Sequence, residues 1–201
     1  MTQPGVLLYF EDEAPAALRL AEASGLEPQQ VHRHRFPDGE MQLTLPARLP
    51  PRVVLLRSLH QPHDKLTELL LAAPTARQLG AVHLSLVAPY LAYMRQDKAF
   101  APGQAVSQRI VGAWLATLFD AVITVDPHLH RVTTLAEVVP AQQAITLSAA
   151  PLLGNWIAKH RPGAFLLGPD SESAQWISQA ATAHGLLHAV CSKERLGDRA
   201  V

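Results

Sequence analysis

Residues 84–100 read LSLVAPYLAYMRQDKAF, and the two halves of this segment differ in character. The first half, Leu84–Pro89, is a short apolar run closed by proline, which is typical of a strand buried on both faces of a parallel sheet. The second half places four polar residues, 95–98, directly after that strand. Open α/β sheets bind ligands in the crevice beyond the carboxyl ends of their strands. The segment therefore predicts an α/β fold with a ligand site at that edge of the sheet.

The four polar residues offer the groups that bind a polyanion: Arg95, Gln96, Asp97 and Lys98. Arginine presents a planar fork that fits phosphate, lysine a point charge, and glutamine both donors and an acceptor, while aspartate can hold a metal or orient a base. The cluster suits a nucleotide triphosphate. A solvated turn of four ordinary surface residues explains the same residues equally well.

The composition describes a chain with ample material for a core and no overall charge. Of the 201 residues, 48% are hydrophobic and 17% are charged, and the formal net charge is zero. A neutral chain argues against wrapping nucleic acid and against a membrane-surface patch. Cys191 is the only cysteine, so a reducing compartment is the simplest interpretation. Because there is neither a leader peptide nor an apolar run of about 18 residues, we expect a cytoplasmic protein with no membrane partner.

Outward from residues 84–100, short apolar runs alternate with amphipathic segments, which favours a mostly parallel sheet flanked by crossover helices. The expected strands include Val6–Phe10, Val53–Leu56 and Ala121–Val125, and the expected helices cover 14–23, 63–79 and a segment beginning near Ser107. In the second of these helices, we expect Leu66, Leu69, Leu70 and Leu71 on or near one face and a kink or a split at Pro74.

A hairpin is expected near the start of the chain. Val31–Phe36 and Glu40–Leu45 both alternate apolar and polar residues, and Pro37-Asp38-Gly39 between them is a turn sequence. The turn also carries chemistry, since RFPDGE at 35–40 offers an aromatic face for a base beside two carboxylates. An ordinary turn with a core phenylalanine is the alternative.

Weak periodicity from Val132 to Ser148 suggests a domain boundary, which we place between residues 143 and 144. A new rhythm follows, with helices at 149–160 and 171–184 and strands at 165–168 and 187–192. Two strands seldom make a stable sheet. We therefore expect either a piece of a longer protein or strands that complete a sheet on the first domain.

Two further polar groups end predicted strands. DPHLH at 126–130 combines a carboxylate, which suits Mg²⁺, with two imidazoles, which suit Zn²⁺ better, although a histidine at a strand end is more often capped or solvated. GPDSES at 168–173 opens a helix, so Asp170 and Ser171 can simply cap it. The common phosphate signatures G-x-x-x-x-G-K-[ST] and G-x-G-x-x-G are absent.

Four motifs in order, RFPDGE at 35–40, YMRQDK at 93–98, VDPH at 125–128 and GPD at 168–170, resemble those of the ribose-phosphate pyrophosphokinases, the phosphoribosyl pyrophosphate synthetases. The resemblance spans nearly the whole chain. It implies two similar α/β domains of the type I phosphoribosyltransferase kind, 1–143 and 144–201, the second incomplete. It also implies an enzyme that transfers the diphosphate of ATP to ribose 5-phosphate, giving phosphoribosyl pyrophosphate and AMP for nucleotide and amino-acid biosynthesis.

The resemblance assigns roles to individual residues. It implies that a hairpin usually lent by a neighbouring subunit recognises adenine, so we expect a homo-oligomer built from dimers, with a hexamer as one option. It implies contacts of the 95–98 cluster with ATP, a metal pair for Mg²⁺, and a flexible catalytic loop of the Lys-x-Arg pattern. The residues that match are Phe36, Asp38 and Glu40 in the hairpin, Arg95, Gln96 and Asp97 at the nucleotide, His128 and Asp170 at Mg²⁺, and Lys193 and Arg195 in the loop.

Three departures from the family pattern bear on function. Residues 171–176, SESAQW, replace the usual small, glycine-rich residues, and Pro127 replaces the more usual leucine. The loop that holds ribose 5-phosphate in the family lies beyond residue 201, so a protein of these residues alone should not complete the reaction. The alternatives are a non-catalytic homologue that regulates an active synthetase and, less favoured, a phosphoribosyltransferase that acts on a base.

Overall fold

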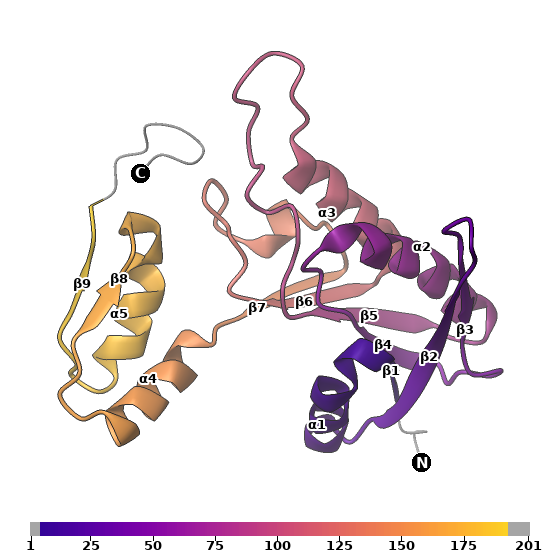
Figure 1. Cartoon of the computed structure of the whole chain (residues 1–201), viewed down its shortest axis with the longest axis horizontal. Coiled ribbons are helices and arrows are strands. Elements are labelled where there is room, and N and C mark those ends of the chain that lie inside the picture. The colour runs from indigo at the N-terminus through magenta and orange to yellow at the C-terminus, as the bar shows by residue number, and fades with distance from the viewer. Residues whose placement is uncertain (1–4, 193–201) are drawn as a thin grey trace. The chain divides into compact units, whose positions relative to one another are not determined.

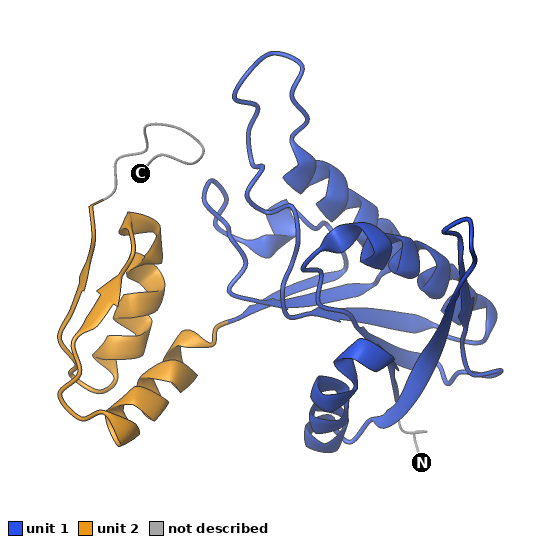
Figure 2. Cartoon of the chain, viewed as in Figure 1, with its two compact units in different colours: residues 1–147 blue, residues 148–201 orange. Residues whose placement is uncertain are grey.

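The structure is a computed structural model that describes residues 5–192. The chain forms two compact units, which divide between Leu147 and Ser148 (Figure 2). Each unit has its own sheet.

The first unit is built on a seven-stranded sheet in the order β3-β2-β1-β4-β5-β6-β7. Every neighbouring pair is parallel except β2 and β3, which form the predicted hairpin. The strands are β1 Val6–Phe10, β2 Glu27–Arg35, β3 Met41–Thr44, β4 Arg52–Leu56, β5 His83–Ala88, β6 Ala121–Val125 and β7 Gln143–Leu147. The predicted mostly parallel α/β sheet is confirmed.

Helices cover both faces of this sheet. Figure 1 shows α2 (Pro62–Gln78) and α3 (Ser107–Leu118) on one side and α1 (Ala14–Ser24) on the other. The two sides have separate cores because successive strand residues point to opposite faces. In β1, Leu8 joins the core under α2 and α3, whereas Leu7 packs with α1. Two 3₁₀ turns, Glu11–Glu13 (η1) and Leu135–Glu137 (η2), complete the unit.

The expected leucine face of α2 is only partly correct. Leu69 is fully buried, but Leu70 and Leu71 are 49% and 38% exposed. The buried face is made instead by three alanines, which let the helix approach the sheet closely, and by two charged residues; these are Ala72, Ala73, Ala76, Lys65 and Glu68. Nor does Pro74 split the helix, which runs without interruption to Gln78.

The first unit extends to Leu147 because β7 pairs along its full length with β6. The expected boundary at residues 143 and 144 therefore falls at the start of a strand. The burial pattern of β7 explains why its sequence did not predict a strand, since four of its five residues are exposed. Without an apolar face, an edge strand has no periodic signal.

The second unit contains a two-stranded parallel sheet and two helices. Its elements are α4 Ala150–His160, β8 Leu166–Gly168, η3 Ser171–Ser173, α5 Ala174–Thr182 and β9 His188–Val190. Because β8 pairs with β9 in a sheet of their own, the expectation that they complete the sheet of the first domain is wrong. The core of this unit is small, with Ala150, Leu166, Ala180 and Ala181 at its centre. Between residues 5 and 192, no helix has the length and apolar character needed to cross a membrane.

Candidate nucleotide site

Loops that follow three neighbouring strands carry the polar groups of the first unit. Strands β4, β5 and β6 are parallel and adjacent, so their carboxyl ends lie at the same edge of the sheet. The loop after β5 contains residues 95–98, and the loop after β6 contains residues 126–131. The topology thus places these two predicted groups side by side.

The backbone at residues 94–97 is held by hydrogen bonds from Gln108 of α3. Met94 is 2% exposed, and its carbonyl accepts a hydrogen bond of 3.0 Å from the side chain of Gln108 in α3. The backbone N–H of Gln108 donates to the carbonyl of Gln96 at 3.2 Å. The Arg95 side chain, between these anchors, is exposed. An exposed guanidinium on a fixed backbone is well suited to bind an incoming anion.

Asp97 is shielded from solvent, unlike Arg95. Its side chain is only 6% exposed, and its Oδ2 lies 3.3 Å from Nε of Arg131 in the next loop. Lys98 lies with its Nζ 4.7 Å from the ring centroid of Phe100, a cation–π contact. The 95–98 cluster therefore divides into residues that face solvent and one that joins the two loops.

His128 sits on a tightly turned loop. Asp126 has a positive φ of 42°, and its N–H donates to the carbonyl of Leu147 at 2.9 Å. Pro127 is buried and His128 is half-buried, with its ring centroid 6.0 Å from that of His130. Non-glycine residues in the left-handed region are uncommon overall, and those that occur are concentrated at functional sites.

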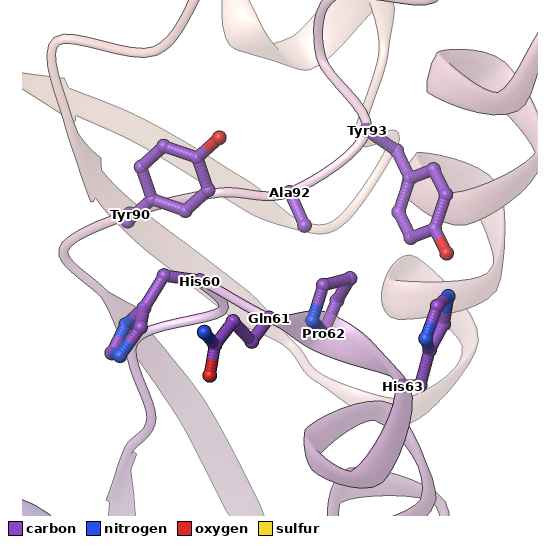
Figure 3. Close-up of a pocket in the computed structure, with 7 residues that line it drawn as sticks. All are labelled: His60, Gln61, Pro62, His63, Tyr90, Ala92 and Tyr93. Carbon is purple, nitrogen blue, oxygen red and sulfur yellow. The ribbon is translucent and has the colours of Figure 1, made fainter.

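The loops after β4 and β5 also enclose a pocket of roughly 360 Å³. Figure 3 shows two facing walls, one with His60, Gln61 and His63 and the other with Tyr90 and Tyr93. Gln61 and Tyr93 both have positive φ, 51° and 65°. Of the pocket residues, Tyr93 opens the YMRQDK motif at 93–98, whereas the sequence predicted no role for His60, Gln61, His63 and Tyr90. Their position directly after two predicted strands was the available signal, but left-handed conformations of Gln and Tyr leave no trace in a sequence.

The hairpin presents its turn to solvent. Phe36 is 40% exposed and meets the ring of His34 edge-on at 4.7 Å, so the alternative of a core phenylalanine is wrong. The carboxylate of Asp38 accepts a hydrogen bond of 3.0 Å from the N–H of Glu40, which shapes the turn. Arg35 is paired with Asp64 of α2. The three predicted residues of the hairpin are thus on one exposed tip.

A network of buried charged side chains lies at the carboxyl ends of β1, β2 and β4, and the sequence did not predict it. Arg57 is 1% exposed and donates to Glu68 at 2.6 Å and to Asp12 at 2.7 Å. Arg33 also pairs with Glu68, and the Arg57 guanidinium lies 4.6 Å from the ring centroid of Phe10. Charged residues that follow a strand usually indicate an exposed loop. The network is therefore visible only from the contacts in three dimensions.

The network shifts the titration of its members. Burial alone would raise the pKa of Asp12, but the hydrogen bond and charge of Arg57 outweigh it and hold this pKa below its usual range. Burial and the nearby charge of Arg57 lower the pKa of Lys65. The Lys65 ammonium donates to the carbonyl of Ser58 at 2.7 Å.

Asp170 belongs to the second unit and follows β8. Its Oδ1 accepts a hydrogen bond of 3.1 Å from the N–H of Ser173, so it caps η3 as the sequence allowed. Lys193 and Arg195 lie outside the described residues.

The described residues could supply some, but not all, of the ligands of a metal ion. Within 5–192 there is no group of three or more His, Cys, Asp or Glu side chains that could hold an ion together. Mg²⁺ commonly keeps several waters and is bound by one or two carboxylates together with substrate phosphates. Asp170 Oδ1 accepts one hydrogen bond in the cap, which leaves both carboxylate oxygens with acceptor capacity.

Comparison with known proteins identifies the relatives of the chain. A ribose-phosphate pyrophosphokinase of Methanopyrus kandleri is 37% identical over 195 residues, covering 95% of this chain and 65% of the relative. Those of Methanosarcina mazei and Halobacterium salinarum are 35% and 32% identical and are covered over 61% and 63% of their lengths. The chain thus spans less than two thirds of these relatives.

The fold is also that of a known enzyme. The crystal structure of phosphoribosylpyrophosphate synthetase from Mycobacterium smegmatis matches 98% of this chain and 68% of that one, with a TM-score of 0.81 at 22% identity. The predicted type I phosphoribosyltransferase-like fold is confirmed. The profile of the N-terminal domain of ribose phosphate pyrophosphokinase matches residues 6–118, more than half of the chain. The chain therefore belongs to the ribose-phosphate pyrophosphokinase family.

Proposed function

We propose that the protein is a ribose-phosphate diphosphokinase, which transfers the diphosphate of ATP to the C1 hydroxyl of ribose 5-phosphate. The observation that carries the proposal is the edge formed by β5 and β6, where Arg95 and His128 stand on adjoining loops. The family membership supports the same reaction. We infer that residues 144–201 begin a second phosphoribosyltransferase-like domain, and that the enzyme works in the cytoplasm.

In the proposed reaction, the C1 hydroxyl oxygen of ribose 5-phosphate attacks the β-phosphorus of ATP. A new C1-oxygen–phosphorus bond forms, the bond from the β-phosphorus to the α,β-bridging oxygen breaks, the hydroxyl proton is lost, and AMP leaves. Such transfers depend on positioning and on stabilising charge on phosphate oxygens. Arg95 is exposed for this purpose, and we infer that Gln96 completes the nucleotide contacts, with Asp97 close by in the same site.

The proposed reaction uses a divalent metal ion, to which two residues of the chain contribute. We infer that His128 and Asp170 help to hold Mg²⁺, whose bound form neutralises charge on the triphosphate. The remaining ligands would come from phosphate and water, as is usual for Mg²⁺. We further infer that Lys193 and Arg195 close over the transferring phosphates and exclude water.

The hairpin supplies the base contact in this proposal. Phe36 is exposed enough to stack on adenine, and the carboxylates of Asp38 and Glu40 can accept hydrogen bonds from its amino group or from the ribose. Because Phe36, Asp38 and Glu40 are all exposed on the β2–β3 hairpin (Figure 1), we propose that this tip serves a second copy in a homo-oligomer built from dimers.

The test is a direct assay of the full-length protein. Incubated with ATP, Mg²⁺ and ribose 5-phosphate, it should form AMP and phosphoribosyl pyrophosphate in equal amounts. Omission of ribose 5-phosphate should abolish AMP formation. Tight ATP binding without AMP formation would instead indicate a regulatory homologue of the synthetase.

A further inference from the structure

The loops after β5 and β6 are joined by an ion pair between Asp97 and Arg131, with 3.3 Å between Oδ2 and Nε. The two partners differ in environment, since the Asp97 side chain is 6% exposed and that of Arg131 is 47% exposed. A carboxylate so far removed from water needs a cation or hydrogen-bond donors close by. Arg131 meets this need from the neighbouring loop.

Loss of Arg131 would leave this carboxylate without its cation. Breaking a buried pair by removing one partner is costly because the other charge stays buried and uncompensated. Without Arg131, the Asp97 carboxylate loses its link to the neighbouring loop, and a turn of this side chain toward water would require the backbone of its own loop to move. Arg131 is half exposed, so its own removal creates no comparable cavity in the core.

A movement of the Asp97 loop would displace its neighbours Arg95 and Gln96. On the amino-terminal side, the segment is held by the buried Met94 and by Gln108, which hydrogen-bonds the carbonyls of Met94 and Gln96. On the carboxyl-terminal side, the Asp97 pair attaches it to the loop that carries His128. A segment held at both ends keeps the backbone of Arg95 and Gln96 in a fixed position relative to that loop.

We propose that Arg131 is a positioning residue of the nucleotide site: by pairing with Asp97, it fixes the loop after β5 against the loop after β6 and so sets Arg95 and Gln96 relative to His128. This inference rests on the proposed function. Arg131 touches no ligand in this role. It pre-organises residues that do, which is effective because small errors in position are costly at sites of transfer.

The first experiment replaces Arg131 in the full-length protein. Arg131→Met should weaken ATP binding, measured by titration calorimetry, and lower kcat/KM by roughly 10- to 100-fold. Arg131→Lys keeps a cation within reach and should recover part of the loss. Arg19→Met, on the exposed face of α1, is the matched control and should change neither quantity. Equal behaviour of Arg131→Met and the control would overturn the proposal.

The second experiment asks whether Arg131 acts through Asp97. In a double-mutant cycle, Asp97→Asn removes the buried charge that needs a partner. The Asp97→Asn/Arg131→Met protein should then bind ATP no more weakly than Asp97→Asn alone. Additive losses would mean that Arg131 contacts the nucleotide itself, and the proposal would be wrong. This double variant leaves no unpaired charge, so it remains usable if Arg131→Met alone does not fold.

Thermal unfolding of the same proteins without ATP separates this inference from the proposed function. The Tm changes of the two single variants should be non-additive, since the two residues form one pair. Additive Tm changes would overturn the inference whatever the result with ATP. A wild-type protein that binds no ATP would overturn the proposed function, while the Tm cycle would still decide whether the pair holds the loops together.

Discussion

At the scale of single residues, Arg57 makes the most consequential contacts in the described part of the first unit. It is 1% exposed and pairs with Glu68, which is itself fully buried. Arg57→Met should lower the free energy of unfolding by about 3–5 kcal/mol, because Glu68 would keep only Arg33 as its partner. Urea unfolding measures this loss. Arg52→Met, at an exposed position at the start of β4, should change it by less than about 0.5 kcal/mol. Similar values for the two variants would contradict the prediction.

Asp120 links stability to pH. Burial would raise its pKa, but the N–H of Leu84 and the guanidinium of Arg77 outweigh burial and lower it below the usual value. A carboxylate whose pKa is lower in the folded state contributes stability above its unfolded pKa and loses it as the pH falls through the folded pKa. Wild-type Tm should therefore fall below about pH 4. Asp120→Asn should have a lower Tm at pH 7 and a smaller difference from wild type at pH 3. A constant difference across this range would contradict the prediction.

Lys193 tests the proposed closing loop. If it acts mainly on the transferring phosphates, Lys193→Ala should reduce kcat by at least about 100-fold and leave the Kd for ATP within a few-fold of wild type. Rapid-quench kinetics and calorimetry measure the two quantities. An equal loss of turnover and affinity would mean that Lys193 binds the ground state as strongly as the transition state.

At the scale of secondary structure, α3 approaches its neighbour so closely that one position requires glycine. A Cβ on Gly112 would lie 2.1 Å from the carbonyl oxygen of Val138, which is backbone and cannot swing away. Gly112→Ala should destabilise the protein by about 1–3 kcal/mol despite the better helix propensity of alanine. Ala113→Ser, on the exposed face of the same helix, is the control for chemical denaturation. Unchanged stability of Gly112→Ala would show that the helix can shift.

The elements themselves were largely predictable, and the exceptions have physical causes. Buried parallel strands such as β1 and β5 are continuous apolar runs that proline or charge closes, so their ends are visible in the sequence. The edge strand β7 is mostly exposed and carries no such signal. The face of α2 was only partly predicted, because alanines and the charged Lys65 and Glu68 join Leu69 in its contact with the core while Leu70 and Leu71 are exposed.

At the scale of the whole molecule, the proposed sharing of the hairpin between subunits predicts complementation. Phe36→Ala would damage the base contact that one subunit lends, and Arg95→Ala would damage the site that receives it. Each variant alone should lose most activity. An unselected random mixture should recover up to about one quarter of wild-type activity, and mixed dimers selected through both tags up to about one half, because each mixed pair has one intact site of two.

Co-expression with two affinity tags provides the mixed oligomers, and the AMP assay measures their activity. Two differently tagged copies of Phe36→Ala are the control and should remain inactive. A mixture no more active than its components would mean that each site takes its hairpin from its own chain. Full activity in a monomer would also contradict the proposal.

Sequence alone determined the α/β class, the hairpin, most strand positions and the motifs that identify the family, because all of these depend on residues close together in the chain. The tertiary structure decided which of the polar groups meet. Asp97 and Arg131 are paired, Arg57 and Glu68 are buried together, and two tyrosines face two histidines across a pocket. Such contacts join residues from different loops, and their partners are set by strand order and by burial. A charged residue has the same letter whether it is solvated or buried, so its role appears only once the sheet has brought its neighbours into place.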